Sequence, residues 1–419
     1  MELDTTLLLI FAQDWLEFAL RWLHVITAIA WIGSSFYFIA LDLGLWRDRT
    51  LPEGAHGEEW QVHGGGFYHI QKYLVAPKNL PEHVTWFKWE SYATWLSGFV
   101  LMVVVYYLGA DIYLIDLEKA ELTKTAAITI SIGSLIVGWV GYSLLCRSKL
   151  GENSTLLMIV LYLLIVALSW GFAQIFTGRA AFLHLGAITA TIMSANVFMV
   201  IIPNQKIVVA DLKAGRTPDA QYGKIAKQRS THNNYLTLPV IFLMLSNHYP
   251  LAFATEYSWI IASLVFLMGV TIRHYFNSMH ARAGKPIWTW AATAGIFLTI
   301  MALSLAPLVI EREEIDDEAG WDTSILTGQA SIMAQHEAFE DVTDIVMGRC
   351  AMCHALEPYY DGFVAAPKGV LLETPNQIAT QAKAILINAA LSHAMPPANV
   401  TYMEPEERQI IKRWFVESH

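Results

Sequence analysis

Residues 156–176 read LLMIVLYLLIVALSWGFAQIF, and residues 181–203 read AFLHLGAITATIMSANVFMVIIP. Each stretch is close to the length of about 20 apolar residues that a helix needs to cross a bilayer. Only a short turn around Gly178 separates them. We therefore expect two consecutive membrane-spanning helices here, and this pair is the starting point for the fold of the whole chain.

Six further stretches have the same apolar character, so the sequence predicts eight spanning helices. The six lie at residues 16–41, 91–110, 126–146, 233–249, 258–276 and 289–310. The composition agrees, because 55% of the 419 residues are hydrophobic and only 15% are charged, with a mean hydropathy of +0.40. Soluble domains carry about a quarter charged residues, so an ordinary cytosolic enzyme is disfavoured. The predicted class is all-α, with an eight-helix transmembrane bundle over residues 1–310.

Positive charge gathers in alternate loops of this predicted bundle. The loops at 42–90, 147–155, 203–232 and 277–288 together hold 15 Lys and Arg, whereas the segments on the opposite side hold 3. Loops rich in Lys and Arg stay in the cytoplasm. Both chain termini are therefore expected on the outer side of the membrane.

Two segments of this region are expected at the membrane interface. Residues 6–12 are apolar, but Glu2 and Asp4 stand where a signal peptide would be basic. We expect these residues to be an interfacial lead-in to the first helix. The run HGGGFYH at 63–69 is expected to form a re-entrant or amphipathic interface segment, since consecutive glycines permit a sharp bend.

The acidic charge of the chain belongs to its tail. Residues 1–310 carry 20 Lys and Arg against 19 Asp and Glu, whereas residues 311–419 carry 7 against 18. The run EREEIDDEAG at 311–320 predicts a solvated linker, which we extend over residues 311–333. The sequence offers no basic stripe to neutralise phosphates, so nucleic-acid binding is disfavoured.

The tail contains the most specific motif of the chain, Cys350-Ala351-Met352-Cys353-His354. The spacing C-x-x-C-H is a c-type haem attachment signal, because two thiols add to the haem vinyl groups and the adjacent His supplies one axial nitrogen. Cys350, Cys353 and His354 are therefore predicted to bind haem c. A zinc or redox CxxC would need further ligands or a βαβ frame, and the sequence has neither.

The second axial ligand is predicted to be Met395, which lies 41 residues beyond the motif and precedes two prolines. The prolines stiffen its loop, and Met ligation raises the reduction potential. Met403 is the alternative ligand. Helices are expected over 334–348 and 404–416, so residues 334–419 resemble a class I cytochrome c. Covalent haem attachment requires export, in agreement with the loop charges.

Ionisable residues inside predicted spans are functional candidates, because burying them in lipid is costly. His24 lies in the first span and His184 near the outer end of the fifth. This pair could ligate a haem b close to the tethered haem c. The alternative is that each is a buried histidine satisfied by hydrogen bonds. His248 and His274 are further candidates for a membrane haem.

A second polar cluster leads into the sixth span on the cytoplasmic side. It contains Arg229, His232, Asn233 and Asn234. A helix start favours anions, and the amides offer donors and acceptors, so a planar, polar, anionic heterocycle would suit such a site. The alternative is that these residues cap the helix and anchor it at the interface, since Asn is a common cap.

Several stretches resemble the bacterial integral-membrane urate oxidases, also called urate hydroxylases. They are RWLHVITAIAWIGSSFYFIALD at 21–42, HGGGFYHIQKYLVAP at 63–77, FKWESYATWLSGF at 87–99, NVFMVIIPNQKIVVADLKAG at 196–215 and RSTHNNYLTLPVIFLMLSNHYP at 229–250. That family fuses an eight-helix membrane domain to a C-terminal cytochrome c, and the resemblance covers essentially the whole chain. It implies a bacterial inner-membrane protein whose N-terminus and cytochrome domain face the periplasm.

The resemblance also implies an activity, the oxidation of urate to 5-hydroxyisourate in purine breakdown. Electrons would pass to cytochrome c and on to a terminal oxidase or a soluble cytochrome c, and not directly to oxygen to form hydrogen peroxide. From position and chemistry we expect His232 to be the general base. Asn233 and Asn234 are the expected urate binders, and Arg229 is the expected anion clamp.

Other sites and functions stay open at this point. An outer-face substrate site could form near Arg21, His24, Gln174 and Arg179, although these residues also suit interface anchoring. A quinol:cytochrome c oxidoreductase would have the same architecture. A haem-handling membrane transporter is a further alternative, but it gives no reason for a tethered haem c.

Overall fold

The computed structural model describes residues 5–48, 50–73, 77, 80–116, 119–253, 255–309, 320–361, 366–392 and 394–418. The chain divides into two compact units. The larger comprises Glu17–Asn247 and Leu251–Leu305, and the smaller comprises Met1–Leu16, His248–Pro250 and Ala306–His419. Residues 311–319 of the predicted acidic linker lie outside the described residues.

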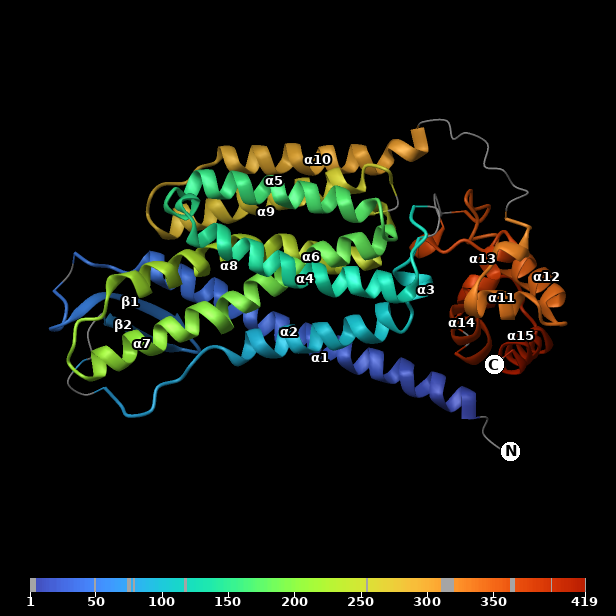
Figure 1. The fold of residues 1–419 in the computed structure, drawn as a ribbon, viewed down its shortest axis with the longest axis horizontal. Coiled ribbons are helices and arrows are strands. Elements are labelled where there is room, and N and C mark those ends of the chain that lie inside the picture. The colour runs from blue at the N-terminus through green and yellow to red at the C-terminus, as the bar shows by residue number, and fades with distance from the viewer. Residues whose placement is uncertain are drawn as a thin grey trace. The chain divides into compact units, whose positions relative to one another are not determined.

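The larger unit consists mainly of long helices that run roughly parallel to one another (Figure 1). The helices are α1 Thr5–Gly44, α2 Trp89–Met102, α3 Ala110–Tyr113, α4 Lys124–Arg147, α5 Ser154–Ala173, α6 Gly178–Ala195, α7 Ile202–Lys213, α8 Ala220–Leu245, α9 Ser258–His280 and α10 Trp288–Val309. The first residues of α1, up to Leu16, and the last of α10, from Ala306, belong to the smaller unit. A π-helical segment, Asn196–Ile201, joins α6 to α7. Helix α8 packs against α6 and against α9.

Six helical segments of the described chain are long and apolar enough to cross a membrane. They are Phe11–Gly44, Lys124–Arg147, Ser154–Ala173, Gly178–Lys213, Ser258–His280 and Trp288–Ala306. The stretches expected at 91–110 and 233–249 are also mostly helical but are not among the six, because α2 has only 14 residues and the first half of α8 is polar. The fold is therefore mostly helical and compatible with a membrane protein, and the eight-span bundle stays a prediction.

The first helix is longer than expected. The position of residues 6–12 at the membrane interface stays a prediction, but helix α1 runs for 40 residues from Thr5 to Gly44, so these residues are helical and continuous with the first span. The physical reason is that no Pro or Gly interrupts the chain between Thr5 and Gly33.

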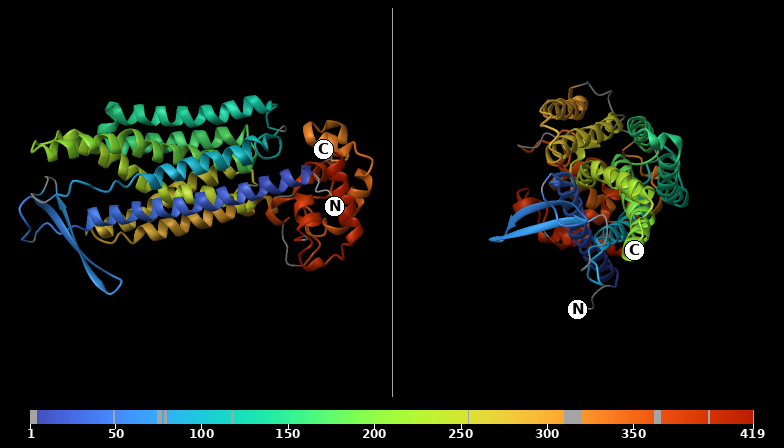
Figure 2. Two further views of the ribbon diagram at one scale, coloured as in Figure 1. Left: turned by 90° about the horizontal axis from the view of Figure 1, so that it is seen from below. Right: turned by 90° about the vertical axis from the view of Figure 1, so that its left-hand side faces the viewer.

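A β-hairpin departs from the all-α prediction. Strands β1 Ala55–His63 and β2 Gly66–Tyr73 pair antiparallel, and Figure 2 shows them extending away from the helices of the larger unit. Gly64 and Gly65 form the two-residue turn with φ of +59° and +78°. Positive φ at both positions is what a type I′ hairpin turn requires. The run at 63–69 is therefore a hairpin turn and strand, and its position at the membrane interface stays a prediction.

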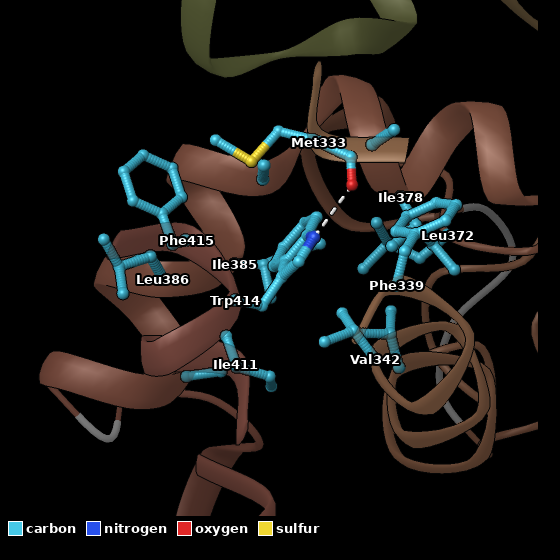
Figure 3. Close-up of a cluster of buried hydrophobic side chains, with 14 of the residues drawn as sticks. Met333, Phe339, Val342, Leu372, Ile378, Ile385, Leu386, Ile411, Trp414 and Phe415 are labelled. Atoms are coloured by element: carbon cyan, nitrogen blue, oxygen red, sulfur yellow. Dashed lines mark hydrogen bonds between the residues drawn. The ribbon is translucent and has the colours of Figure 1, made fainter. Parts of the chain in front are cut away.

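The smaller unit is built from short helices around one apolar core. These helices are α11 Gly328–Ala334, α12 Phe339–Arg349, α13 Pro375–Thr380, α14 Ala382–Ile385 and α15 Pro405–Glu417. Trp414 lies in this core, where its Nε1 donates to the carbonyl oxygen of Met333 at 2.9 Å and its ring stacks on Phe339 (Figure 3). The predicted closing helix at 404–416 is confirmed as α15, whereas the helix predicted at 334–348 is interrupted between α11 and α12.

Candidate functional site

The predicted polar cluster lies inside a helix and not at its start. Helix α8 begins at Ala220, with Asp219 as its N-cap, so Arg229 follows more than two turns later. The argument from helix capping and from the helix N-terminus is therefore wrong for Arg229, His232, Asn233 and Asn234. All four side chains are buried in the bundle, where polar groups require partners.

Three of these residues share a hydrogen-bond network with α4 and α6. His232 Nδ1 lies 2.8 Å from the hydroxyl of Tyr142. Asn196 Nδ2 donates to that hydroxyl at 3.0 Å and to Asn233 Oδ1 at 2.9 Å. Asn233 Nδ2 in turn donates to the carbonyl oxygen of Met193 at 2.9 Å. The network holds the imidazole and the amides in fixed orientations.

Arg229 places a positive charge in the same network. Its guanidinium donates at 3.4 Å to Asn196 Oδ1 and at 3.4 Å to the carbonyl oxygen of Ser143, and it lies 4.8 Å from the ring centroid of Tyr142. The side chain is only 1% exposed. Within the described residues it pairs with no carboxylate, and its Nε has no hydrogen-bond partner. A buried cation without a counter-ion is costly, so this cluster is suited to receive an anion.

Asn234 belongs to a different cluster, contrary to the expectation of one site. Its Oδ1 accepts from Arg273 Nε at 3.3 Å and from Asn277 Nδ2 at 2.9 Å, both on α9. Arg273 also donates to Asn277 Oδ1 at 3.0 Å and lies 4.2 Å from the ring centroid of Phe36 on α1. The reason is helical geometry, since successive residues of a helix point about 100° apart.

The two predicted haem b histidines have different neighbours. His24 Nδ1 lies 3.0 Å from the carbonyl oxygen of Thr94 and 3.2 Å from Ser97 Oγ, both on α2. His184 is fully buried, with Nδ1 2.7 Å from the carbonyl oxygen of Ala180 and Nε2 2.5 Å from Ser131 Oγ. As placed, both ring nitrogens of His184 are bonded to protein. The arrangement does not present this pair as two free axial ligands.

Within the described chain, no hydrogen bond or ion pair joins the alternative outer-face residues to one another, although Arg21 and Arg179 both lie near Tyr106. Arg21 is neutralised by an ion pair with Glu17. Arg179 lies 5.9 Å from the ring centroid of Tyr113, and Gln174 is exposed. Arg229 differs from these residues in being fully buried without a carboxylate partner among the described residues.

The cysteine motif in the tail forms a tight turn directly after α12. The amides of Cys353 and His354 donate to the carbonyl oxygen of Cys350 at 3.1 and 2.9 Å. His354 Nδ1 lies 2.9 Å from the carbonyl oxygen of Val370. This bond assigns the proton to Nδ1 and leaves Nε2 available, as is usual for an iron-ligating histidine. Burial raises the pKa of the Cys350 thiol to about 12.

The two candidate methionines differ in burial. Met403 is 2% exposed and belongs to the apolar core of the smaller unit. Met395 lies outside this core, with its backbone fixed by bonds to Asn388 and Arg408 at 2.8 and 2.9 Å. Met395 is therefore the less buried of the two, and the choice between them as a haem ligand stays a prediction. Among the residues that the structure describes, His, Cys, Asp and Glu form no group of three that could hold a metal ion without a porphyrin.

Four polar residues of the bundle clusters were missed by sequence reasoning. They are Tyr142, Asn196, Arg273 and Asn277. Arg273 and Asn196 lie inside predicted apolar spans, and the rule that selected His24 applies equally to them. Tyr142 carries no such signal, because tyrosine is common near membrane interfaces.

The fold and these clusters together define a mostly helical protein with six candidate membrane spans and with basic and amide side chains buried in its larger unit. Residues 10–304 match the family described as Urate oxidase N-terminal, and the chain belongs to this family. The match ends before the cysteine motif. Neither the curated proteins nor the solved structures contain a match to the chain.

Proposed function

We propose that the protein is an integral-membrane enzyme that oxidises urate to 5-hydroxyisourate. The family match over residues 10–304 is the observation that carries this proposal. Six helices suited to span a bilayer support a bacterial inner-membrane location. The loop charges support a periplasmic N-terminus and tail.

The cluster around Arg229 is the proposed substrate site, because urate is an anion near neutral pH. Conversion of urate and one water to 5-hydroxyisourate releases two electrons and two protons. His232 can accept one proton at Nε2 when its Nδ1–H donates to Tyr142, 2.8 Å away. Arg229 attracts the anion, and Asn233 orients it from the same side of α8. Asn234 enters this site only through the second cluster discussed below.

The tail is the proposed electron acceptor. Cys350 and Cys353 would attach haem c, and His354 and Met395 would be its axial ligands. When bound, this haem accepts electrons one at a time and passes them to the respiratory chain, either to a terminal oxidase or to a soluble cytochrome c. His354 supports this role, because its Nδ1 is held by Val370 and its Nε2 is free to bind iron.

A membrane haem b ligated by His24 and His184 stays a separate prediction. The bonds of His184 to Ser131 and Ala180 would have to be replaced before its ring could bind iron. We propose no electron-transfer step through such a haem.

The test mixes urate anaerobically with purified, oxidised protein and follows the haem absorption bands. Stoichiometric urate is expected to reduce a c-type band. His232→Ala should lower the rate of reduction by about 100-fold or more, the contribution typical of a general base, and leave the oxidised haem spectrum unchanged. His63→Ala, at an exposed position of the hairpin, is the control and should react at the wild-type rate.

Two results would contradict the proposal. Near-normal reduction in His232→Ala would remove His232 from the mechanism. Reduction by a quinol but not by urate would favour the quinol:cytochrome c oxidoreductase instead.

A further inference from the structure

A second buried guanidinium, that of Arg273 on α9, lies beside Asn234 of α8. Arg273 is 5% exposed, and within the described residues it pairs with no carboxylate. Its hydrogen bonds go to neutral amide oxygens, those of Asn234 and Asn277. The aromatic face of Phe36 contributes attraction to the cation but no formal counter-charge. The positive charge of this cluster is therefore uncompensated.

The cluster also contains an unused donor. Asn234 is fully buried, and its Oδ1 accepts two hydrogen bonds while its Nδ2 has no partner among the described residues. A buried N–H group without a partner costs about 1–3 kcal/mol. Closely packed apolar neighbours cannot satisfy it, whereas a ligand oxygen can.

Adjacent residues of α8 connect this cluster to the proposed substrate site. Asn233 is bonded within the Arg229 network and Asn234 within the Arg273 network. The Cα atoms of consecutive residues are about 3.8 Å apart, so the two clusters flank the same turn of α8. Among the described residues of α8, Arg229 Nε and Asn234 Nδ2 are buried donors without a hydrogen-bond partner, about one and a half turns apart.

We propose that Arg273, positioned by Asn234 and Asn277, is a second substrate-binding guanidinium that binds an oxygen of the purine anion on the side remote from His232. This inference rests on the proposed function. In this arrangement the cluster beside Arg229 contains the proton acceptor, His232, whereas the cluster of Arg273 only binds the substrate. Two cations also favour a ring that carries negative charge on more than one edge.

The test measures equilibrium binding of radiolabelled urate to full-length protein whose haem is kept reduced by ascorbate, so that urate is not consumed. Arg273→Gln removes the charge. Asn277→Asp keeps both the arginine and the side-chain size but supplies an internal carboxylate beside it. Each variant should bind urate about 10- to 100-fold more weakly, as expected for the loss of a charge-assisted hydrogen bond. Arg282→Gln, which removes an exposed cation stacked on Trp46 at 3.6 Å, is the charge-matched control and should bind normally.

Steady-state kinetics separate a binding role from a catalytic one. Arg273→Gln and Asn277→Asp should raise KM with kcat retained, whereas His232→Ala should lower kcat. Wild-type affinity in a folded Asn277→Asp protein would overturn the inference, because a structural arginine gains from a nearby carboxylate while an anion-binding one is blocked by it. Absence of urate binding to the wild type would instead refute the proposed function itself.

Discussion

Tyr142 is hydrogen-bonded to one ring nitrogen of His232, so the direction of this bond decides which tautomer the imidazole adopts. Its hydroxyl lies 2.8 Å from His232 Nδ1 and accepts a further hydrogen bond from Asn196 at 3.0 Å. If Nδ1–H donates to this oxygen, the lone pair of His232 is on Nε2, which is bonded to no other described residue. Tyr142 is therefore a positioning residue for the proposed base.

Tyr142→Phe removes only the hydroxyl and should test this role. We expect kcat for urate to fall by about tenfold, the factor that corresponds to the loss of one hydrogen bond of about 1.4 kcal/mol. The pH dependence of kcat should also shift, because the imidazole of His232 loses the hydrogen bond that fixes its tautomer and contributes to its pKa. Tyr162→Phe is the control, since that hydroxyl makes only a 3.4 Å bond to the carbonyl oxygen of Ser263. An unchanged pH profile in Tyr142→Phe would contradict the role.

The residue types of the candidate site could be predicted from the sequence, but their grouping could not. Arg229, His232 and Asn233 do share a network, whereas Asn234 bonds to α9. Adjacent positions in a chain point to different neighbours in a helix, and which neighbours these are depends on packing. The sequence placed the cluster at a helix start because the polar first turns of α8 resemble a loop.

At the scale of the element, the contact between α8 and α9 depends on one glycine. Pro239 lies inside α8, and a Cβ added at Gly269 on α9 would lie 2.5 Å from its Cδ and 2.7 Å from its Cγ. A proline ring is rigid and cannot move aside as a flexible side chain could. The close approach of these helices carries Arg273 and Asn277 towards Asn234.

Gly269→Ala should therefore destabilise the bundle by about 1–3 kcal/mol, the usual cost of overpacking. Thermal unfolding of the detergent-solubilised protein measures this effect, and urate affinity should fall with it. Gly295→Ala on α10 is the matched control, because nothing lies within 4 Å of an added Cβ there. Equal stability of the two variants would show that α8 and α9 do not approach this closely.

A second link joins α12 to α15 on either side of the cysteine motif. Arg349 Nε lies 2.9 and 3.1 Å from the two carboxylate oxygens of Glu407. Burial acts to raise the pKa of Glu407, but hydrogen bonds from Arg349 and from the amide of Glu404 outweigh it and hold this pKa below its usual range. A carboxylate with a lowered native pKa stabilises the fold above its unfolded pKa of about 4.3. That stabilisation is lost as the pH falls through the lower, native value.

Glu407→Gln should increase hydrogen exchange in the tail at pH 7, and this effect should diminish as the pH falls below the usual pKa range of a glutamate, because the wild-type carboxylate then becomes protonated too. Peptide-resolved hydrogen exchange of the full-length protein, with variant and wild type compared at the same pH, reports this difference for residues 339–349 and 405–417. The effect should be small, because the pair is partly exposed. A difference that persists undiminished in acid would show that Glu407 acts through packing and not through its charge.

The hairpin shows why element type was harder to predict than helix position. Long apolar stretches identify helices without knowledge of their neighbours, and each of the eight expected segments is mostly helical. Strands β1 and β2 have both apolar and polar residues at exposed positions. The alternation of apolar and polar residues that marks a strand with one buried face is therefore weak in this segment. The usable signal was the turn, since two glycines between strand-forming residues favour a type I′ hairpin.

At the scale of the whole molecule, the division into two units agrees with the change in charge along the sequence. The larger unit ends at Leu305, and the acidic run begins at 311. The family match also stops at residue 304. The proposed haem c site in the tail therefore rests on the C-x-x-C-H motif and on the orientation of His354, and not on the family match.

The proposed haem c requires a particular membrane orientation of the chain, because haem c is attached to a protein only after export. The 15 Lys and Arg in alternate loops predict that Lys224 faces the cytoplasm and Glu340 the periplasm. Both side chains are exposed. Lys224→Cys should react with a membrane-impermeant maleimide in inverted vesicles but not in spheroplasts, and Glu340→Cys should show the reverse. The parent protein is the control, because it shows how much label reacts with the native cysteines, which are the buried Cys146 and the motif residues Cys350 and Cys353. Labelling of Glu340→Cys from the cytoplasmic side would place the C-x-x-C-H motif where haem c cannot be attached, and would remove the proposed electron acceptor together with the proposed orientation.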